Sequence, residues 1–185
     1  MSKAFTSEET PDAGVVVPAR APLPSGTPNY VTPRGLSLLQ AELTRLEAER
    51  ERLDAGGDGE TKVAERMRRG AVVAAQINEL AARLGSAVVV DPRGQPRDEV
   101  RFGATVTLRP AGDDGQPARR YTIVGVDEAN AAEGRLAFVS PLARALLGRR
   151  TGEVIEMRVR RDTGNAMQIV AIDYATGLEV TATDG

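Results

Sequence analysis

Two leucine-rich stripes with a glycine-rich break between them constrain this chain more than any other feature. Apolar side chains recur at intervals of three and four residues in the first stripe, at Leu36, Leu39, Leu43, Leu46 and Leu53. The second stripe repeats these intervals at Val73, Ile77, Leu80 and Leu84. Such spacing places the apolar side chains on one face of a helix. The sequence therefore predicts two helices, each with one apolar face.

The segment between the stripes predicts how these two helices are connected. Residues 54–60 read Asp-Ala-Gly-Gly-Asp-Gly-Glu, and no helix tolerates so many glycines across its middle. The helices must therefore fold back into an antiparallel coiled-coil hairpin, which we place at residues 30–91 with its tip near residues 54–61. Thr32 and Pro33 mark the start, because a hydroxyl caps free amides and proline lacks a donor that the first turn does not need.

The half of the hairpin near the tip is expected to be looser than the base. Arg50, Arg66 and Gly70 stand where an unbroken heptad would have apolar side chains. Basic residues follow the turn at Lys62, Arg66, Arg68 and Arg69. Two interpretations remain open for them. They are either a solvated helix face paired with the acids nearby, or a basic strip that contacts RNA phosphates.

The rest of the chain divides by composition and period. Residues 1–29 are rich in Pro, Ser, Thr and Ala and predict a flexible extension, and residues 92–98 predict a linker. Residues 99–176 predict a second domain, with strands at 100–108, 121–126, 136–139, 154–159 and 166–174, a short helix at 142–147, and a frayed tail at 177–185. The fold class is α+β, a helical hairpin beside a small, mostly antiparallel sheet.

Composition excludes several kinds of chemistry. Cysteine and histidine are both absent, which removes disulfides, thiolate catalysis, the usual zinc ligands and the commonest general base. The net charge is −2, so a nucleic acid would need a local basic patch. No apolar run approaches the roughly 18 residues of a membrane span, and the N-terminus lacks a secretory pattern. We therefore expect a cytoplasmic protein with no membrane partner.

Three blocks of the second domain stand out, residues 100–106, residues 121–129 and above all residues 139–153, Val-Ser-Pro-Leu-Ala-Arg-Ala-Leu-Leu-Gly-Arg-Arg-Thr-Gly-Glu. These blocks resemble the C-terminal domain of the GreA/GreB transcript cleavage factors. Residues 29–35, Asn-Tyr-Val-Thr-Pro-Arg-Gly, resemble the start of the coiled coil in the same family. The resemblance implies an FKBP-like second domain without prolyl isomerase activity. It also implies a monomeric elongation factor whose partners are bacterial RNA polymerase, with the coiled coil in its secondary channel, and the nascent RNA.

The same resemblance assigns roles at the tip. In Gre factors two acids in the motif Gly-Asp-x-x-Glu-Asn help to hold the second Mg²⁺ of the polymerase, so that backtracked RNA is hydrolysed. The matching residues here are Asp58 and Glu60, as catalytic and metal-binding residues. Such a factor has no cofactor of its own beyond Mg²⁺ shared with the polymerase, and it is not an enzyme by itself.

This sequence departs from the family motif at that point. Its tip reads Gly57-Asp58-Gly59-Glu60-Thr61, so the second acid comes one residue early and the asparagine is missing. The hairpin also reads as several residues shorter, and a loss of seven residues would withdraw the tip by about 10 Å. Two alternatives therefore stay open, a non-cleaving occupant of the secondary channel and, less consistent with the C-terminal blocks, a dimerisation coil.

Anchoring to the partner is expected from the block around the short helix. Ser140, Pro141, Arg144, Arg149 and Arg150 are the candidate partner-binding residues. The alternative is that the leucines of this block pack the helix while the arginines are only solvated.

Overall fold

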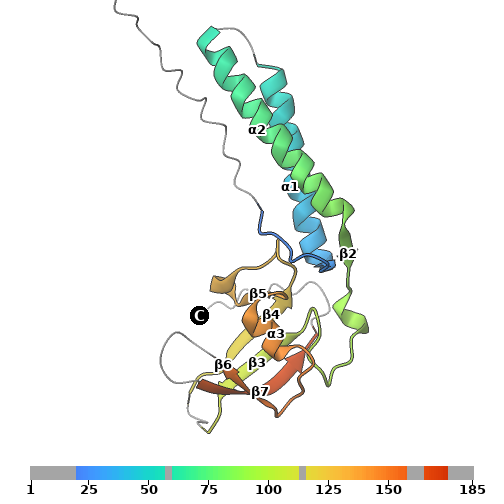
Figure 1. The fold of residues 1–185 in the computed structure, drawn as a ribbon, viewed down its shortest axis with the longest axis vertical. Helices are drawn as coiled ribbons and strands as arrows, with labels where there is room; N and C mark the ends of the chain where they lie inside the picture. Colours follow the sequence, from blue (N-terminus) through green and yellow to red (C-terminus); the bar gives the residue numbers. More distant parts are fainter. Residues whose placement is uncertain (1–19, 57–59, 113–115, 158–164, 175–185) are drawn as a thin grey trace, which may run out of the picture.

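A long helical hairpin stands on a small β domain in the computed structural model, which describes residues 20–56, 60–112, 116–157 and 165–174. Helices α1 (Pro33–Asp54) and α2 (Glu60–Gly85) run side by side from the base to the tip (Figure 1). Thr32 caps α1 by accepting a hydrogen bond from the amide of Gly35 at 2.9 Å, and Pro33 is the first helical residue. The start expected for the first helix is confirmed.

The two leucine stripes meet between the helices as the sequence predicts. Leu39, Leu46, Val73 and Leu80 are buried there. The partly buried members of this seam are Leu36, Leu43, Leu53, Ile77 and Leu84. No fully buried side chain lies beyond Leu46 on α1 or before Val73 on α2 among the described residues. The seam therefore weakens toward the tip.

Two short strands close the base of the hairpin, and the sequence did not predict them. Strand β1 (Asn29–Val31) precedes α1, strand β2 (Ala87–Val89) follows α2, and the two pair in parallel. The buried side chain of Asn29 donates to the carbonyl of Arg83 at 2.9 Å and to the hydroxyl of Ser86 at 3.1 Å. Strands of three residues are too short to show a period.

The second domain is one five-stranded sheet carrying a short helix. Its strands are β3 (Thr105–Pro110), β4 (Arg119–Val124), β5 (Arg135–Ala137), β6 (Val154–Met157) and β7 (Asn165–Asp173), and their order across the sheet is β5-β4-β3-β7-β6. Helix α3 (Pro141–Leu146) lies between β5 and β6 in the chain. The α+β fold class is thus confirmed.

The sheet is mixed, because β5 pairs with β4 in parallel while the other pairs are antiparallel. A parallel partner needs a crossover instead of a tight hairpin. Here residues 125–134, which include the short 3-10 helix η2 (Ala131–Glu133), carry the chain back to the same end of the sheet. The expectation of a mostly antiparallel sheet is confirmed, since the other pairs of described strands are antiparallel.

The first strand also begins later than its alternation suggested. Val100 and Phe102 are buried and Arg101 between them is exposed, but residues 102–104 are all buried and β3 starts only at Thr105. Gly103 has φ of +87°, which side chains with a Cβ rarely adopt, and a Cβ there would lie 2.8 Å from the ring of Pro92. The turn lets Gly103 lie against Pro92 of the linker, in the 3-10 helix η1 (Pro92–Gly94).

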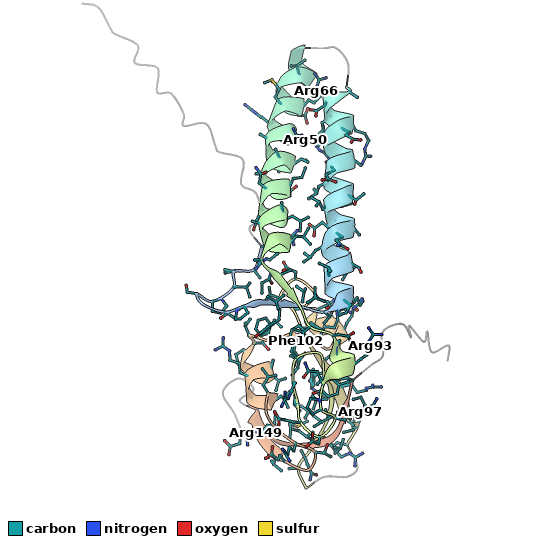
Figure 2. All side chains as sticks on the ribbon, turned by 90° about the vertical axis from the view of Figure 1, so that its right-hand side faces the viewer. Arg50, Arg66, Arg93, Arg97, Phe102 and Arg149 are labelled. Carbon is teal, nitrogen blue, oxygen red and sulfur yellow. The ribbon has the colours of Figure 1, made fainter. Side chains whose placement is uncertain are left out.

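The hairpin and the β domain share packing at their junction. The rings of Tyr30, Phe102 and Phe138 lie 5.6 to 5.7 Å apart, centroid to centroid, in tilted and edge-on arrangements. Figure 2 places Phe102 at the level where the hairpin meets the domain.

Among the described residues, no helix is long and apolar enough to cross a membrane.

Candidate functional site

The tip of the hairpin is the end farthest from the β domain (Figure 1). At about 1.5 Å per residue, the 22 residues of α1 and 26 of α2 give lengths of about 33 and 39 Å. Asp58 lies outside the described residues. Glu60 is the first residue of α2, and its side chain is also outside the described part. The assignment of these two acids to a metal site stays a prediction.

Basic residues of the tip half differ in what they contact. Arg66 donates from its guanidinium to the carbonyl of Gly56 and so ties α2 to the turn. Arg69 forms an ion pair with Glu49 of α1 at 2.7 Å, and this hydrogen bond from Arg69 holds the pKa of Glu49 below its ordinary value. Figure 2 shows Arg66 in this half of the hairpin. These two arginines therefore have a structural task within the coil.

One further residue of the basic strip, Arg68, has no such pairing among the described residues and is exposed on α2. Lys62 belongs to α2, but its side chain lies outside the described part. Within the same described residues, no group of three or more acidic side chains is placed to hold a metal ion.

The candidate anchoring residues surround α3. Ser140 caps this helix by accepting from the amide of Ala143 at 3.3 Å, and Pro141 is its first residue. Leu146 is fully buried, and Leu142 and Leu147 pack against the same core. The leucines therefore hold the helix on the β domain. Such packing fixes the direction in which the helix displays its polar residues.

The three arginines of this block are exposed, and only Arg150 among them forms ion pairs with other described residues. Arg144 and Arg149 are exposed, and Arg149 lies near the end of the molecule opposite the tip (Figure 2). Arg150 forms ion pairs with Asp98 at 3.5 Å and with Glu99 at 3.9 Å. Arg144 and Arg149 are thus the members of the block that can meet a partner without breaking an ion pair between described residues.

A polar cluster at the junction joins the base of the hairpin to the β domain, and local sequence patterns did not predict it. The carboxylate of Glu128 is buried and accepts from the Thr32 hydroxyl at 2.5 Å, and Arg34 pairs with it at 3.2 Å. Asp127, beside it, pairs with Arg83 of α2 at 3.2 Å. The available signal was the pair of adjacent acids directly after an apolar strand. Carboxylates at such a place are prone to burial, and a buried carboxylate needs a partner.

Comparison with known proteins agrees with this architecture. A model of the C-terminal part of the transcription elongation factors GreA/GreB matches residues 95–174. Transcription elongation factor GreA of Zymomonas mobilis is 41% identical over 135 residues, which cover 68% of this chain and 83% of that protein. The chain belongs to the GreA/GreB family. GreA of Brucella canis is 34% identical over 159 residues, covering 78% of this chain and 96% of that protein.

Solved structures of the GreA/GreB family also align with this member. A GreA/GreB factor from Nitrosomonas europaea covers 78% of this chain and 98% of its own length, at 21% identity and a TM-score of 0.40. The matched family region runs from the linker to the end of β7 and includes α3 with Ser140. The resemblance expected from residues 139–153 is confirmed at the level of the family.

Proposed function

We propose that this Gre-type factor binds bacterial RNA polymerase during elongation. The β domain docks on the outer surface of the polymerase, and the hairpin enters the secondary channel. The observation that carries the proposal is the rod itself, about 33–39 Å of paired helices held on the β domain by a packed junction. Membership of the GreA/GreB family supports it. The factor then acts in the cytoplasm by what its tip does inside the polymerase and has no reaction of its own.

At the tip, Asp58 and Glu60 are the residues that would hold a Mg²⁺ ion shared with the polymerase. The donor chemistry fits in kind, since Mg²⁺ takes one or two carboxylates and keeps water for its other positions. Such an ion supplies charge stabilisation for hydrolysis of the RNA backbone. Asp58 would come from the segment that joins α1 to α2, and Glu60 would come from the start of α2. The polymerase must supply the remaining carboxylates.

A second candidate is a channel occupant that does not stimulate cleavage. Glu60 is the first residue of α2, where a negative charge stabilises a helix through its dipole without any metal. The tip motif is also one residue shorter than the family's between its two acids. In this alternative the factor changes pausing or elongation by occupying the channel.

Stalled, backtracked elongation complexes separate these candidates. Stimulated cleavage would shorten the 3′ end of the RNA with wild-type factor, and Asp58→Asn would abolish shortening while polymerase binding stays within twofold. Asp54→Asn is the matched control, because Asp54 is an exposed acid at the end of α1. Absence of shortening with wild-type factor at saturating concentration would select the non-cleaving alternative. Absence of polymerase binding would refute both.

Binding through α3 has its own test. Arg144→Ala and Arg149→Ala together should weaken polymerase affinity about tenfold, because both are exposed and free to meet carboxylates of a partner. Arg119→Ala is the matched control, since Arg119 is an exposed arginine at the start of β4. Equal affinity of the double variant and the control would contradict the assignment of this block to anchoring.

A further inference from the structure

The segment ahead of the hairpin packs across the junction between the hairpin and the β domain. Residues 20–28 form no helix or strand, yet they contact α1, α2 and the β domain. This differs from the flexible extension expected for residues 1–29. We propose that residues 20–28 are a strap that fixes the angle between the hairpin and the β domain, with Arg20 as its positioning residue.

Arg20 joins three parts of the chain that are far apart in sequence. Its guanidinium forms an ion pair with Glu42 of α1 at 2.5 Å and another with Asp127, which follows β4, at 3.2 Å. Its backbone amide donates to Glu79 of α2 at 3.0 Å. One residue therefore connects both helices to the β domain.

The neighbours of Arg20 extend the same bridge. Arg83 of α2 donates to the carbonyl of Ala21 at 2.5 Å and approaches the second oxygen of Asp127 at 3.2 Å. Leu23 packs against the core of the β domain. Gly26 then takes φ of +75° in a turn that leads the chain into β1. The strap thus begins at the helices, touches the β domain and ends in the base of the hairpin.

The charges of this cluster explain why an arginine is needed. The side chains of Arg20, Arg83 and Asp127 expose only 18%, 11% and 9% of their surface. Burial alone would lower the pKa of Arg20, but the hydrogen bonds and charges of Glu42 and Asp127 outweigh it and raise that pKa. A planar guanidinium has five donors in a fixed fork, so it can bind two carboxylates at once, which an ammonium does less well.

The angle that the strap fixes has a functional consequence, which rests on the proposed function. If the β domain docks on the polymerase, the direction of the rod decides where the tip lies. At a tip about 33–39 Å from the base, a tilt of 15° moves the tip by about 9–10 Å. Loss of the strap should therefore leave docking intact and misplace the tip.

Distance measurement on the free protein tests the strap without any polymerase. The chain has no cysteine, so Ala48→Cys on α1 and Ala118→Cys before β4, both at exposed positions, give a clean pair of spin labels. Double electron–electron resonance should give one narrow distance distribution in this background. Arg20→Ala should at least double its width, and Arg20→Lys should give an intermediate width.

Controls make each outcome decisive. Arg45→Ala is the matched variant, because Arg45 is an exposed arginine whose ion pair with Glu49 stays within α1, and it should leave the distribution unchanged. Circular dichroism of Arg20→Ala should keep the helical signal of the hairpin. An unchanged distance distribution in Arg20→Ala would overturn the strap, and so would loss of helical signal, since Arg20 would then be needed for folding instead of placement.

Polymerase assays add a second measurement that fails separately. With Arg20→Ala, affinity for the polymerase should stay within twofold of wild type, while the effect of the factor on transcription falls at least fivefold. A wild-type factor that does not bind polymerase would refute the proposed function and leave the distance result standing. An unaltered transcriptional effect, alongside a broadened distribution, would refute the link between angle and tip action.

Discussion

Removing the hydroxyl of Thr32 should lower the free energy of unfolding substantially, because this one group makes two hydrogen bonds. This single oxygen accepts the amide of Gly35 as the cap of α1 and donates to the buried carboxylate of Glu128. Thr32→Val keeps the shape of the side chain and deletes both hydrogen bonds. Thr32→Ser keeps the hydroxyl and deletes only a methyl group, so it separates the two effects.

The magnitude follows from the two bonds. Loss of a helix cap costs about 0.5–2 kcal/mol, and loss of a hydrogen bond to a charged group costs about 1.5–3 kcal/mol. The exposed surface of Thr32 is only 7% and that of Glu128 6%, so water does not easily replace the lost partner. We expect Thr32→Val to lower the free energy of unfolding by about 2–5 kcal/mol.

Urea denaturation followed by circular dichroism measures this difference. Thr32→Ser should stay within about 1 kcal/mol of wild type, since the hydroxyl remains. Thr44→Val is the control for the substitution itself, because Thr44 is exposed and bonds only a carbonyl of its own helix at 3.2 Å. If Thr32→Val and Thr32→Ser unfold at the same urea concentration, the hydroxyl does not join the hairpin to the β domain as argued.

Three further outcomes are expected. Leu80→Ala empties a fully buried position of the seam and should cost about 2–5 kcal/mol in urea unfolding; a cost below 1 kcal/mol would deny that Leu80 anchors the base. Gly125→Ala would place a Cβ 2.7 Å from the Tyr30 carbonyl oxygen and should destabilise by about 1–3 kcal/mol, against no change if the backbones can separate. Hydrogen bonds from Arg93 lower the pKa of Asp91 from 3.8 to about 2, so its contribution to stability is present above pH 3.8 and is lost as the pH falls toward 2. An NMR titration should find that midpoint near 2 and a higher midpoint in Arg93→Gln, still below 3.8 because the backbone amide of residue 93 keeps its hydrogen bond to Asp91; identical midpoints would refute the pairing.

Local periodicity predicted the elements that have local causes. The stripe from Leu36 to Leu53 and its partner from Val73 to Leu84 gave both helices, because helical faces repeat within a few residues. Ser140 and Pro141 likewise gave the start of α3. Each of these signals is contained within one element.

Contacts between distant residues left no such signal. Arg20 and Asp127 are 107 positions apart, and nothing in the composition of residues 1–29 distinguishes the part that packs. The parallel partner of β4 depends on a crossover whose path periodicity does not encode. At the tip, resemblance named Asp58 and Glu60, and the sequence alone cannot say whether a turn so rich in glycine holds them for a metal.

The parallel pair β1 and β2 implies an order in which the chain assembles. Asn29 pairs with Ala87, 58 positions later, and closing a disordered loop of that length costs about 3–4 kcal/mol in chain entropy. A folded hairpin brings the same ends together beforehand. During synthesis on the ribosome, β1 can therefore pair with β2 only after both helices have been made and have packed together. The base of the rod is thus completed after its middle.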